Sequence, residues 1–338
     1  MGAIWFSPKE LPDHLHEIVG YKSGVAASIE QMADLLSGTG YDDDLLRSEE
    51  SGIRIRSEDY DSLYYKLIHK IGVTEEPYEG AFGVMSALQE LAKEHGQSFV
   101  MSISNIYQEG CVAGAKRAAK DGKSSIDPTP MLMETLKKHG EKGAKVLLEI
   151  ISCYENHRKL SPNMHGRFNE WKGLVNLSDL FELQNSQMPT HGEFLDQRFI
   201  NFLAENGEAI GKIHWRKFEE LTAECFNQFG YKVELGPGSN DDGVDVRVWH
   251  PDVESAPHYI VQCKRQKKKV DKVTIKGLYA DVLHEKAQQG LLITTTELSP
   301  GAKHTIQARQ YPIEEVNGSM VLSWVKALRT PGAGIVRV

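Results

Sequence analysis

Apolar residues recur at intervals of three or four positions through most of the first 210 residues. The pattern is clear in GVAASIEQMADLL, YDSLYYKLIHKIGV, FGVMSALQELAKEHG, AKVLLEIISCY and FLDQRFINFLAENG. This spacing places apolar side chains on one face of an α-helix. Glycines and prolines separate the segments, as at Gly38–Gly40, Pro128–Pro130 and Pro162. We therefore predict a mostly helical region over residues 1–210.

The pattern changes after about Gly211. A helical segment, HWRKFEELTAECFNQFG, is followed by three strand-like runs, YKVEL, VDVRVW and HYIVQCK. A helix (KVTIKGLYADVLHEKAQQG), a strand (LLITTT) and two further helices (SPGAKHTIQARQ and SMVLSWVKAL) complete the chain. Consecutive strands flanked by helices are typical of a mixed sheet covered on both faces. The fold class is therefore α+β, with an α/β domain over 211–338 and a boundary near Asn206–Lys212.

Charge divides the chain at the same place. The net charge is −8, yet residues 211–338 carry 18 Lys and Arg against 15 Asp and Glu, while residues 1–210 carry 21 against 32. Such asymmetry indicates different partners for the two halves. The acidic half would repel DNA, so we expect residues 1–210 to contact a protein partner or a ligand, or to hold subunits together.

The sequence does not favour a secreted or membrane protein. No apolar run reaches the roughly 18 residues that a membrane helix requires. The N-terminal MGAIWFSPKELPDHLHEI contains charges too early for a secretory signal. The four cysteines lie far apart with no CxxC pair, which argues against a zinc site. We expect a reduced, cytoplasmic protein.

The strand HYIVQCK places two polar side chains on one face. Side chains alternate along a strand, so Gln262 and Lys264 share a face while Tyr259, Val261 and Cys263 share the other. The second set is apolar and is expected to be buried. An amide and an ammonium group on a strand flanked by apolar residues indicate a possible site.

A hairpin would bring Asp245 to this strand. The turn-rich PDVESAP centres near residue 254, so Asp245 would lie opposite Gln262 or Cys263. Residues directly opposite each other have Cβ atoms about 4.5–5.5 Å apart, and diagonal ones about 7–8 Å. Asp245, Gln262 and Lys264 can therefore converge if Asp245 shares their face.

The preceding helix supplies one further acid. At about 100° per residue, Glu219 lies at the edge of the apolar stripe, whereas Glu220 and Glu224 point away and are interpreted as solvated surface. The stripe consists of Trp215, Phe218, Leu221, Cys225, Phe226 and Phe229.

Two acids, an amide oxygen and a lysine suit a hard metal ion. Mg²⁺ prefers oxygen ligands and keeps several waters. It polarises a phosphoryl oxygen and lowers the pKa of bound water, while a lysine can orient that water and stabilise growing charge. Each piece also has an ordinary explanation, since Asp-Gly pairs are common in turns and a QxK at a strand end is usually exposed. Their ordered combination favours a site.

The segments FEELTAECFNQFGYKVELGPGSNDDGVDVRV, IVQCKR and LLITTTELSPGA together resemble the Mrr-type restriction endonuclease domain of the PD-(D/E)xK nuclease superfamily, over about 211–329. The resemblance implies that Asp245 is the principal metal ligand and that Gln262 and Lys264 form a QxK variant of the (D/E)xK motif. It places the helix glutamate at Glu219 and a supporting role at Asp241. It also implies Mg²⁺ as cofactor, for which Mn²⁺ can substitute.

A basic run lies just past this motif. Arg265, Lys267, Lys268 and Lys269 could contact the phosphates of DNA, which supply most sequence-independent affinity. A charged run is equally often a solvated surface, so both interpretations stay open.

These features together predict a metal-dependent endonuclease that cuts DNA, double-stranded in the favoured interpretation, in restriction or anti-phage defence. Residues 1–210 would control activation or specificity. Two facing domains would suit a double-strand cut, so we expect a homo-oligomer, a dimer or higher. The alternatives are a non-catalytic DNA-binding module and a sensor or protein-interaction protein with an accessory nuclease domain.

Overall fold

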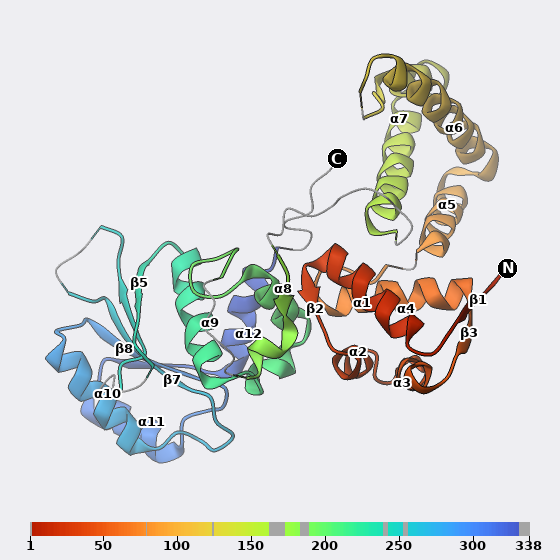
Figure 1. Ribbon diagram of the computed structural model, residues 1–338. Coiled ribbons are helices and arrows are strands. Elements are labelled where there is room, and N and C mark those ends of the chain that lie inside the picture. The colour runs from red at the N-terminus through yellow and green to blue at the C-terminus, as the bar shows by residue number, and fades with distance from the viewer. Residues whose placement is uncertain are drawn as a thin grey trace.

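The computed structural model describes residues 2–78, 80–123, 125–161, 173–182, 189–238, 243–252 and 256–330. Figure 1 shows three parts: a small body near the N-terminus, a helical arm that rises from it, and a sheet domain at the other end. Within the described ranges, no helix combines the length and apolar character that crossing a bilayer requires.

The N-terminal body packs helices against a two-stranded antiparallel sheet. Strand β1 (Ala3–Phe6) pairs with β3 (Ile53–Arg56), and a short parallel pair joins β2 (Val25–Ala26) to β4 (Val175–Asn176). Ser28 caps α2 with a reciprocal capping box to Gln31. The helices of the body are α1 (Glu10–Ser23), α2 (Ile29–Leu35), α3 (Asp42–Glu50) and α4 (Ser57–Lys70).

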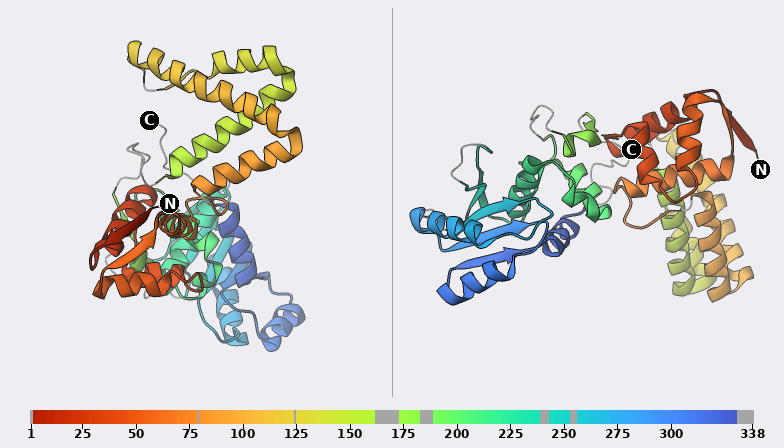
Figure 2. Two further views of the ribbon diagram at one scale, coloured as in Figure 1. Left: turned by 90° about the vertical axis from the view of Figure 1, so that its right-hand side faces the viewer. Right: turned by 90° about the horizontal axis from the view of Figure 1, so that it is seen from below.

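The arm is built from three long helices with a hydrophobic core of their own (Figure 2). They are α5 (Ala81–His95), α6 (Gln97–Lys120) and α7 (Thr129–Leu160). Helix α7 is interrupted at Gly140, whose φ of 67° lies in the region that glycine adopts most easily. The predicted helical character of this half of the chain is confirmed.

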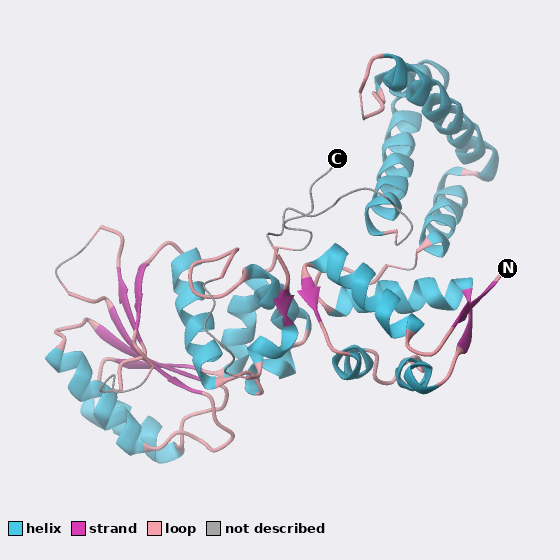
Figure 3. Cartoon of the chain, in the orientation of Figure 1, coloured by secondary structure: helices cyan, strands magenta, loops and turns pink. Residues whose placement is uncertain are grey.

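The C-terminal domain contains a five-stranded mixed sheet in the order β5-β6-β7-β8-β9 (Figure 3). The pairs β5–β6 and β6–β7 are antiparallel, and β7–β8 and β8–β9 are parallel. The strands are β5 (Lys232–Leu235), β6 (Val246–Trp249), β7 (Tyr259–Lys264), β8 (Gln289–Thr294) and β9 (Ile313–Val316).

Helices cover both faces of this sheet, as predicted. Apolar residues of α9 (Trp215–Gln228) and α12 (Gly318–Ala327) share a core with one face, and those of α10 (Lys272–His284) and α11 (Pro300–Arg309) share a core with the other. The sequence interpretation omitted β9, because its four residues, IEEV, contain two consecutive acids and no alternating pattern.

A short segment before residue 211 packs on the sheet domain. It contains α8 (Gln197–Glu205) and the 3-10 helix η2 (Gly207–Gly211), while η1 (Leu177–Leu180) precedes it. Side-chain amides of Gln197 and Asn201 donate to the backbone carbonyls of Leu328 and Thr330, at 2.9 and 3.2 Å. The hydrophobic core continues without a break from the N-terminal body through α8 into α9.

A buried arginine joins this segment to the N-terminal body. Arg198 Nε lies 2.7 Å from Asp196 Oδ1, and both side chains are 2% exposed. Arg198 Nη1 also donates to the carbonyls of Gly24 and Gly173, at 2.9 and 2.8 Å. One guanidinium group therefore holds together three segments that are distant in sequence.

Candidate active site

The β6–β7 hairpin has the register that the sequence predicts. Val246 pairs with Val261, so Asp245 lies directly opposite Gln262. The Asp245 N–H donates to the Val261 carbonyl at 3.0 Å, and Asp245 Oδ2 accepts from the Cys263 N–H at 2.6 Å. The Asp245 carboxylate is therefore held against β7 beside Gln262, in a setting where it is only 6% exposed.

Side chains along β7 alternate between the two cores. Tyr259, Val261 and Cys263 lie in the core that contains α9, and Ile260 lies in the core that contains α10. Gly243, which the Gln262 amide contacts, is also close to Asp281 of α10. Gln262 therefore lies on the α10 side of the strand, and the predicted alternation is confirmed.

The Gln262 side chain is 9% exposed and only partly hydrogen-bonded. Its Nε2 donates to the Gly243 carbonyl at 3.0 Å. Because a carbonyl can only accept, this bond fixes which end of the amide is nitrogen. The other end, Oε1, is buried and has no hydrogen-bond partner among the described residues. A buried acceptor without a partner costs about 1–3 kcal/mol, so this oxygen is poised for a ligand.

Gly243 makes the position of this amide possible. Its φ is +91°, and a Cβ there would lie 3.1 Å from Gln262 Nε2. Any other residue would therefore be strained in the backbone and crowd the amide. Gly243 thus has a packing role beside the Gln262 amide, beyond the ordinary use of glycine in turns.

Charges from three elements act on one buried thiol. Burial raises the pKa of Cys263 well above its ordinary value, and the Asp245 carboxylate raises it further. A hydrogen bond with Thr222 lowers this pKa, Glu219 raises it and Lys264 lowers it. Asp245, Glu219 and Lys264 are therefore all within electrostatic reach of the middle residue of the QxK motif.

Lys264 is the last residue of β7 and is half-buried. Its carbonyl accepts from Thr294 Oγ1 at 2.8 Å and from the Thr295 N–H at 3.3 Å. Thr295 Oγ1 in turn accepts from the Gln266 N–H at 3.1 Å. Thr294, the last residue of β8, and Thr295, which follows it, therefore fix the backbone around the lysine.

Glu219 is buried at the edge of the site, 6% exposed. Its Oε2 accepts from Arg216 Nη1 at 2.8 Å, so it approaches the site as part of an ion pair. It comes from α9, on the side of β7 opposite to Gln262.

The interpretation of Glu220 and Glu224 as solvated surface is wrong. Glu220 is 8% exposed and accepts from Lys217 Nζ at 2.7 Å. Glu224 is 1% exposed, and its Oε2 accepts from the backbone N–H groups of Glu193, Phe194 and Leu195, at 3.0, 2.7 and 3.3 Å. The segment before α8 covers the outer face of α9, which a periodicity argument on α9 alone cannot reveal.

Asp241 lies outside the described residues. The basic run leaves the end of β7 and is exposed from Gln266 to Lys269. Lys269 lies 3.2 Å from Glu297, whereas Lys267 and Lys268 form no ion pair within the part of the chain that the structure describes. Arg265 Nη1 donates to the Gly211 carbonyl at 3.4 Å.

No group of three or more His, Cys, Asp or Glu side chains within the described ranges could hold a metal ion. A metal at this site would depend on Asp245, on the Gln262 amide oxygen and on water. That is a small set of protein ligands, which suits Mg²⁺ because it usually keeps several bound waters.

Comparison with known proteins places this domain in a family. Residues 210–325 match the family model Mrr_cat, described as restriction endonuclease. The uncharacterized protein y4cE of Sinorhizobium fredii (strain NBRC 101917 / NGR234) is 28% identical over 123 residues, which cover 33% of this chain and 32% of that protein. The match thus spans about a third of its length.

Among solved structures, the MspJI restriction endonuclease in complex with a 27-mer oligonucleotide is similar at 20% identity and a TM-score of 0.28, over 55% of this chain and 41% of that chain. The family match covers the hairpin and α9, which hold Asp245, Gln262, Lys264 and Glu219. Residues 210–325 therefore form a restriction endonuclease domain of the Mrr type.

Proposed function

We propose that residues 211–338 hydrolyse phosphodiester bonds in double-stranded DNA with the help of Mg²⁺. The observation that carries the proposal is the Gln262 Oε1 atom, a buried acceptor with no partner among the described residues. It lies on the hairpin where Asp245 stands opposite Gln262 and Lys264 follows. A catalytic metal site explains why a nuclease domain keeps such an oxygen.

The residues present fit a hard divalent cation. Asp245 and Gln262 would supply oxygen ligands from adjacent strands, and Asp241 would support the site. Glu219, on the other side of β7, would contribute from α9 after its carboxylate leaves Arg216. When bound, Mg²⁺ polarises the phosphoryl oxygen and lowers the pKa of a water molecule. Because Gln262 replaces an acid, the set carries one charge less, and we expect weaker metal binding than a fully acidic set would give. Mn²⁺ is expected to substitute.

Lys264 acts on the reacting phosphate. Its ammonium group would orient the attacking water and stabilise the negative charge that grows on the phosphate oxygens. The Thr294 and Thr295 bonds to the surrounding backbone limit the movement of the strand end that bears this lysine. Arg265 and the exposed Lys267, Lys268 and Lys269 continue from it and would contact the DNA backbone.

We assign the whole chain to restriction or anti-phage defence in the cytoplasm. In this proposal residues 1–210 control activation or specificity, through a protein partner, a ligand or subunit contacts. The continuous core between the N-terminal body, α8 and α9 supports a mechanical link between the two halves. Two copies would supply the two sites that a double-strand cut requires.

Plasmid cleavage tests the proposal. With Mg²⁺ the protein should convert supercoiled plasmid to nicked or linear forms, and EDTA should prevent this. Asp245→Ala and Lys264→Ala should each lower the rate by at least about 100-fold, the usual effect of removing one group that stabilises transition-state charge. Thermal unfolding should show that both variants remain folded.

The controls are surface residues of the same type, Asp252→Ala and Lys326→Ala, which should cleave at the wild-type rate. Wild-type cleavage by either site variant would show that the site is assigned wrongly. Binding of the plasmid without cleavage, in Mg²⁺ and in Mn²⁺, would favour a non-catalytic DNA-binding module.

A further inference from the structure

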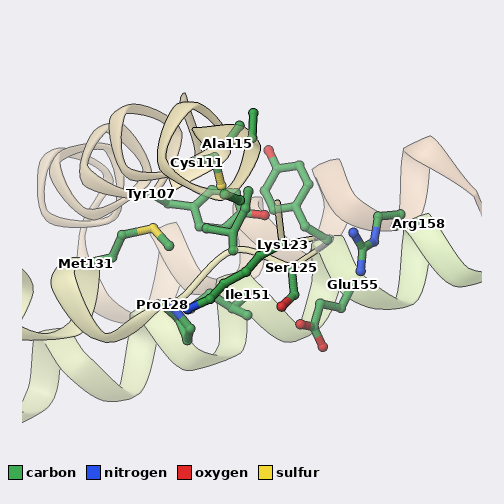
Figure 4. A pocket seen from close by; sticks show the side chains of 14 residues that line it. Tyr107, Cys111, Ala115, Lys123, Ser125, Pro128, Met131, Ile151, Glu155 and Arg158 are labelled. Carbon is green, nitrogen blue, oxygen red and sulfur yellow. The ribbon is translucent and has the colours of Figure 1, made fainter. Parts of the chain in front are cut away.

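The arm contains a cavity of about 580 Å³ between α6 and α7 (Figure 4). Figure 4 shows Met131 at one end of it and Arg158 with Glu155 at the other. Cavities that bind small molecules are commonly about 300–1,000 Å³, with mostly apolar walls and a few polar groups. This cavity lies in the arm, in residues that the nuclease domain does not include.

Small residues on α6 shape the cavity, two of them by allowing close packing and two by leaving space. A Cβ at Gly114 would lie 2.3 Å from the Ile126 side chain, and one at Gly110 would lie 2.1 Å from Met131. These two glycines therefore let the connection after α6 and the start of α7 pack closely over α6. Beyond them, Ala115 and Ala118 leave room that larger side chains would fill.

A pair of aromatic rings forms one wall. Tyr107 of α6 and Tyr154 of α7 stack with ring centroids 5.0 Å apart and an angle of 21° between the planes. Burial raises the pKa of Tyr107 above its ordinary value, so its hydroxyl stays protonated at neutral pH. Stacked rings present a flat apolar surface to a ligand with a flat body.

Two cations, Lys123 and Arg158, line the cavity. Neither forms a salt bridge at short distance within the described part of the chain, although Asp127 lies within electrostatic reach of Lys123. Glu155 is the one acid among the lining residues, so the lining carries a net positive charge. An anionic ligand would neutralise this charge and accept charge-assisted hydrogen bonds from Arg158.

We propose that this cavity binds a small organic anion with an aromatic or otherwise flat apolar body. The apolar wall would contact the body of the ligand, and Arg158 with Lys123 would bind its carboxylate, sulfonate or phosphate group. The inference does not depend on the nuclease activity, and its test measures binding alone.

Two fluorescent dyes provide the test on the full chain. 8-Anilinonaphthalene-1-sulfonate is a flat aromatic anion, and N-phenyl-1-naphthylamine is its neutral analogue. The anionic dye should bind saturably at one per chain. Arg158→Gln should weaken it about tenfold, the effect of one charge-assisted hydrogen bond, and should change affinity for the neutral dye by less than about twofold. Ala118→Trp should fill the hollow and weaken both dyes by at least about tenfold.

The matched control is Lys145→Gln, which removes an exposed cation of α7 outside the cavity and should leave both affinities unchanged. The proposal fails if the anionic dye does not saturate, if Ala118→Trp folds and binds both dyes as tightly as wild type, or if Arg158→Gln and Lys145→Gln have equal effects. Equal weakening of both dyes by Arg158→Gln would also overturn it, because the change would then be structural. If Ala118→Trp does not fold, the affinities of Arg158→Gln for the two dyes decide whether the proposal holds.

Discussion

Two of the regions that bury polar side chains differ in how completely those side chains are hydrogen-bonded. At the junction, defined here as Asp196, Arg198 and Glu224 with the backbone they hold, carboxylate oxygens and guanidinium nitrogens meet partners in the protein. At the end of the β6–β7 hairpin, the Gln262 amide satisfies its nitrogen and leaves its oxygen without a partner among the described residues.

This difference distinguishes buried polar groups that stabilise the fold from a buried polar group that is available to bind a ligand. A buried charge with complete hydrogen bonding contributes to a specific fold, and removal of one partner is costly. A buried acceptor without a partner opposes folding by about 1–3 kcal/mol, so its presence calls for an explanation, and a bound ligand is one. Variants at the junction should therefore lower stability, while truncation of Gln262 should lower activity at nearly constant stability.

Arg198 offers the largest stability effect. Arg198→Ala should lower the free energy of unfolding by about 3–5 kcal/mol, because it leaves the Asp196 carboxylate buried without its partner. Chemical denaturation of the full chain measures the change. Arg309→Ala, an exposed arginine on α11, should change stability by no more than about 0.5 kcal/mol. A small effect at Arg198 would mean that water or a local rearrangement replaces the ion pair.

The same pair gives a pH dependence. Burial alone would raise the pKa of Asp196, but the hydrogen bonds and charge of Arg198 outweigh this and hold it below its ordinary value. A lowered folded-state pKa contributes stability above the unfolded pKa of about 3.9 that is lost as the pH falls through the folded value. The wild type should lose this contribution only in acid, and Arg198→Ala should lack that acid-dependent step.

Variants of Gln262 test the prediction for the end of the β6–β7 hairpin. Gln262→Ala should raise the Mg²⁺ concentration for half-maximal plasmid cleavage by at least about tenfold. Gln262→Glu adds the charge that the ligand set lacks, so its midpoint should lie at or below that of wild type although the glutamate loses the bond to Gly243.

The matched control is Gln228→Ala, an amide that donates to Glu224 at 2.8 Å. It should lower stability by about 1 kcal/mol and leave the Mg²⁺ midpoint unchanged. Equal shifts of the midpoint in the two alanine variants would remove the distinction between the two regions.

The hairpin was predictable from the sequence, and the junction was not. Pro251 and Pro257 frame the turn, so counting residues placed Asp245 opposite Gln262 or Cys263, and the observed register selects Gln262. Glu224 reaches backbone N–H groups about 30 residues earlier in the chain. Any residue offers a backbone N–H, so no pattern of side chains indicates such an interaction.

The domain boundary at Asn206–Lys212 stays a prediction. The contacts at the junction indicate which fragments should test it. A fragment of residues 207–338 would lack the backbone that Glu224 binds and the helix that packs on α12. A fragment beginning at residue 189 keeps both, so it should unfold at a temperature several degrees higher. Limited proteolysis of the full chain adds an independent measurement. First cuts at 206–212 with a stable C-terminal product would support the boundary, and first cuts inside 231–300 would show that the two halves do not behave as separate domains.

The basic run should give the smallest effect. Lys267, Lys268 and Lys269 are exposed, so their replacement by Ala should leave stability nearly unchanged. If they bind phosphates, duplex DNA affinity should fall uniformly across sequences, and the slope of log affinity against log salt should decrease by about 0.9 for each phosphate that the variant no longer neutralises. Lys269 already has Glu297 within 3.2 Å, so we expect Lys267 and Lys268 to account for most of the change. Lys303→Ala, another exposed lysine paired with a glutamate, is the control. An unchanged slope in the triple variant would identify the run as solvated surface and would leave DNA binding to residues nearer the hairpin.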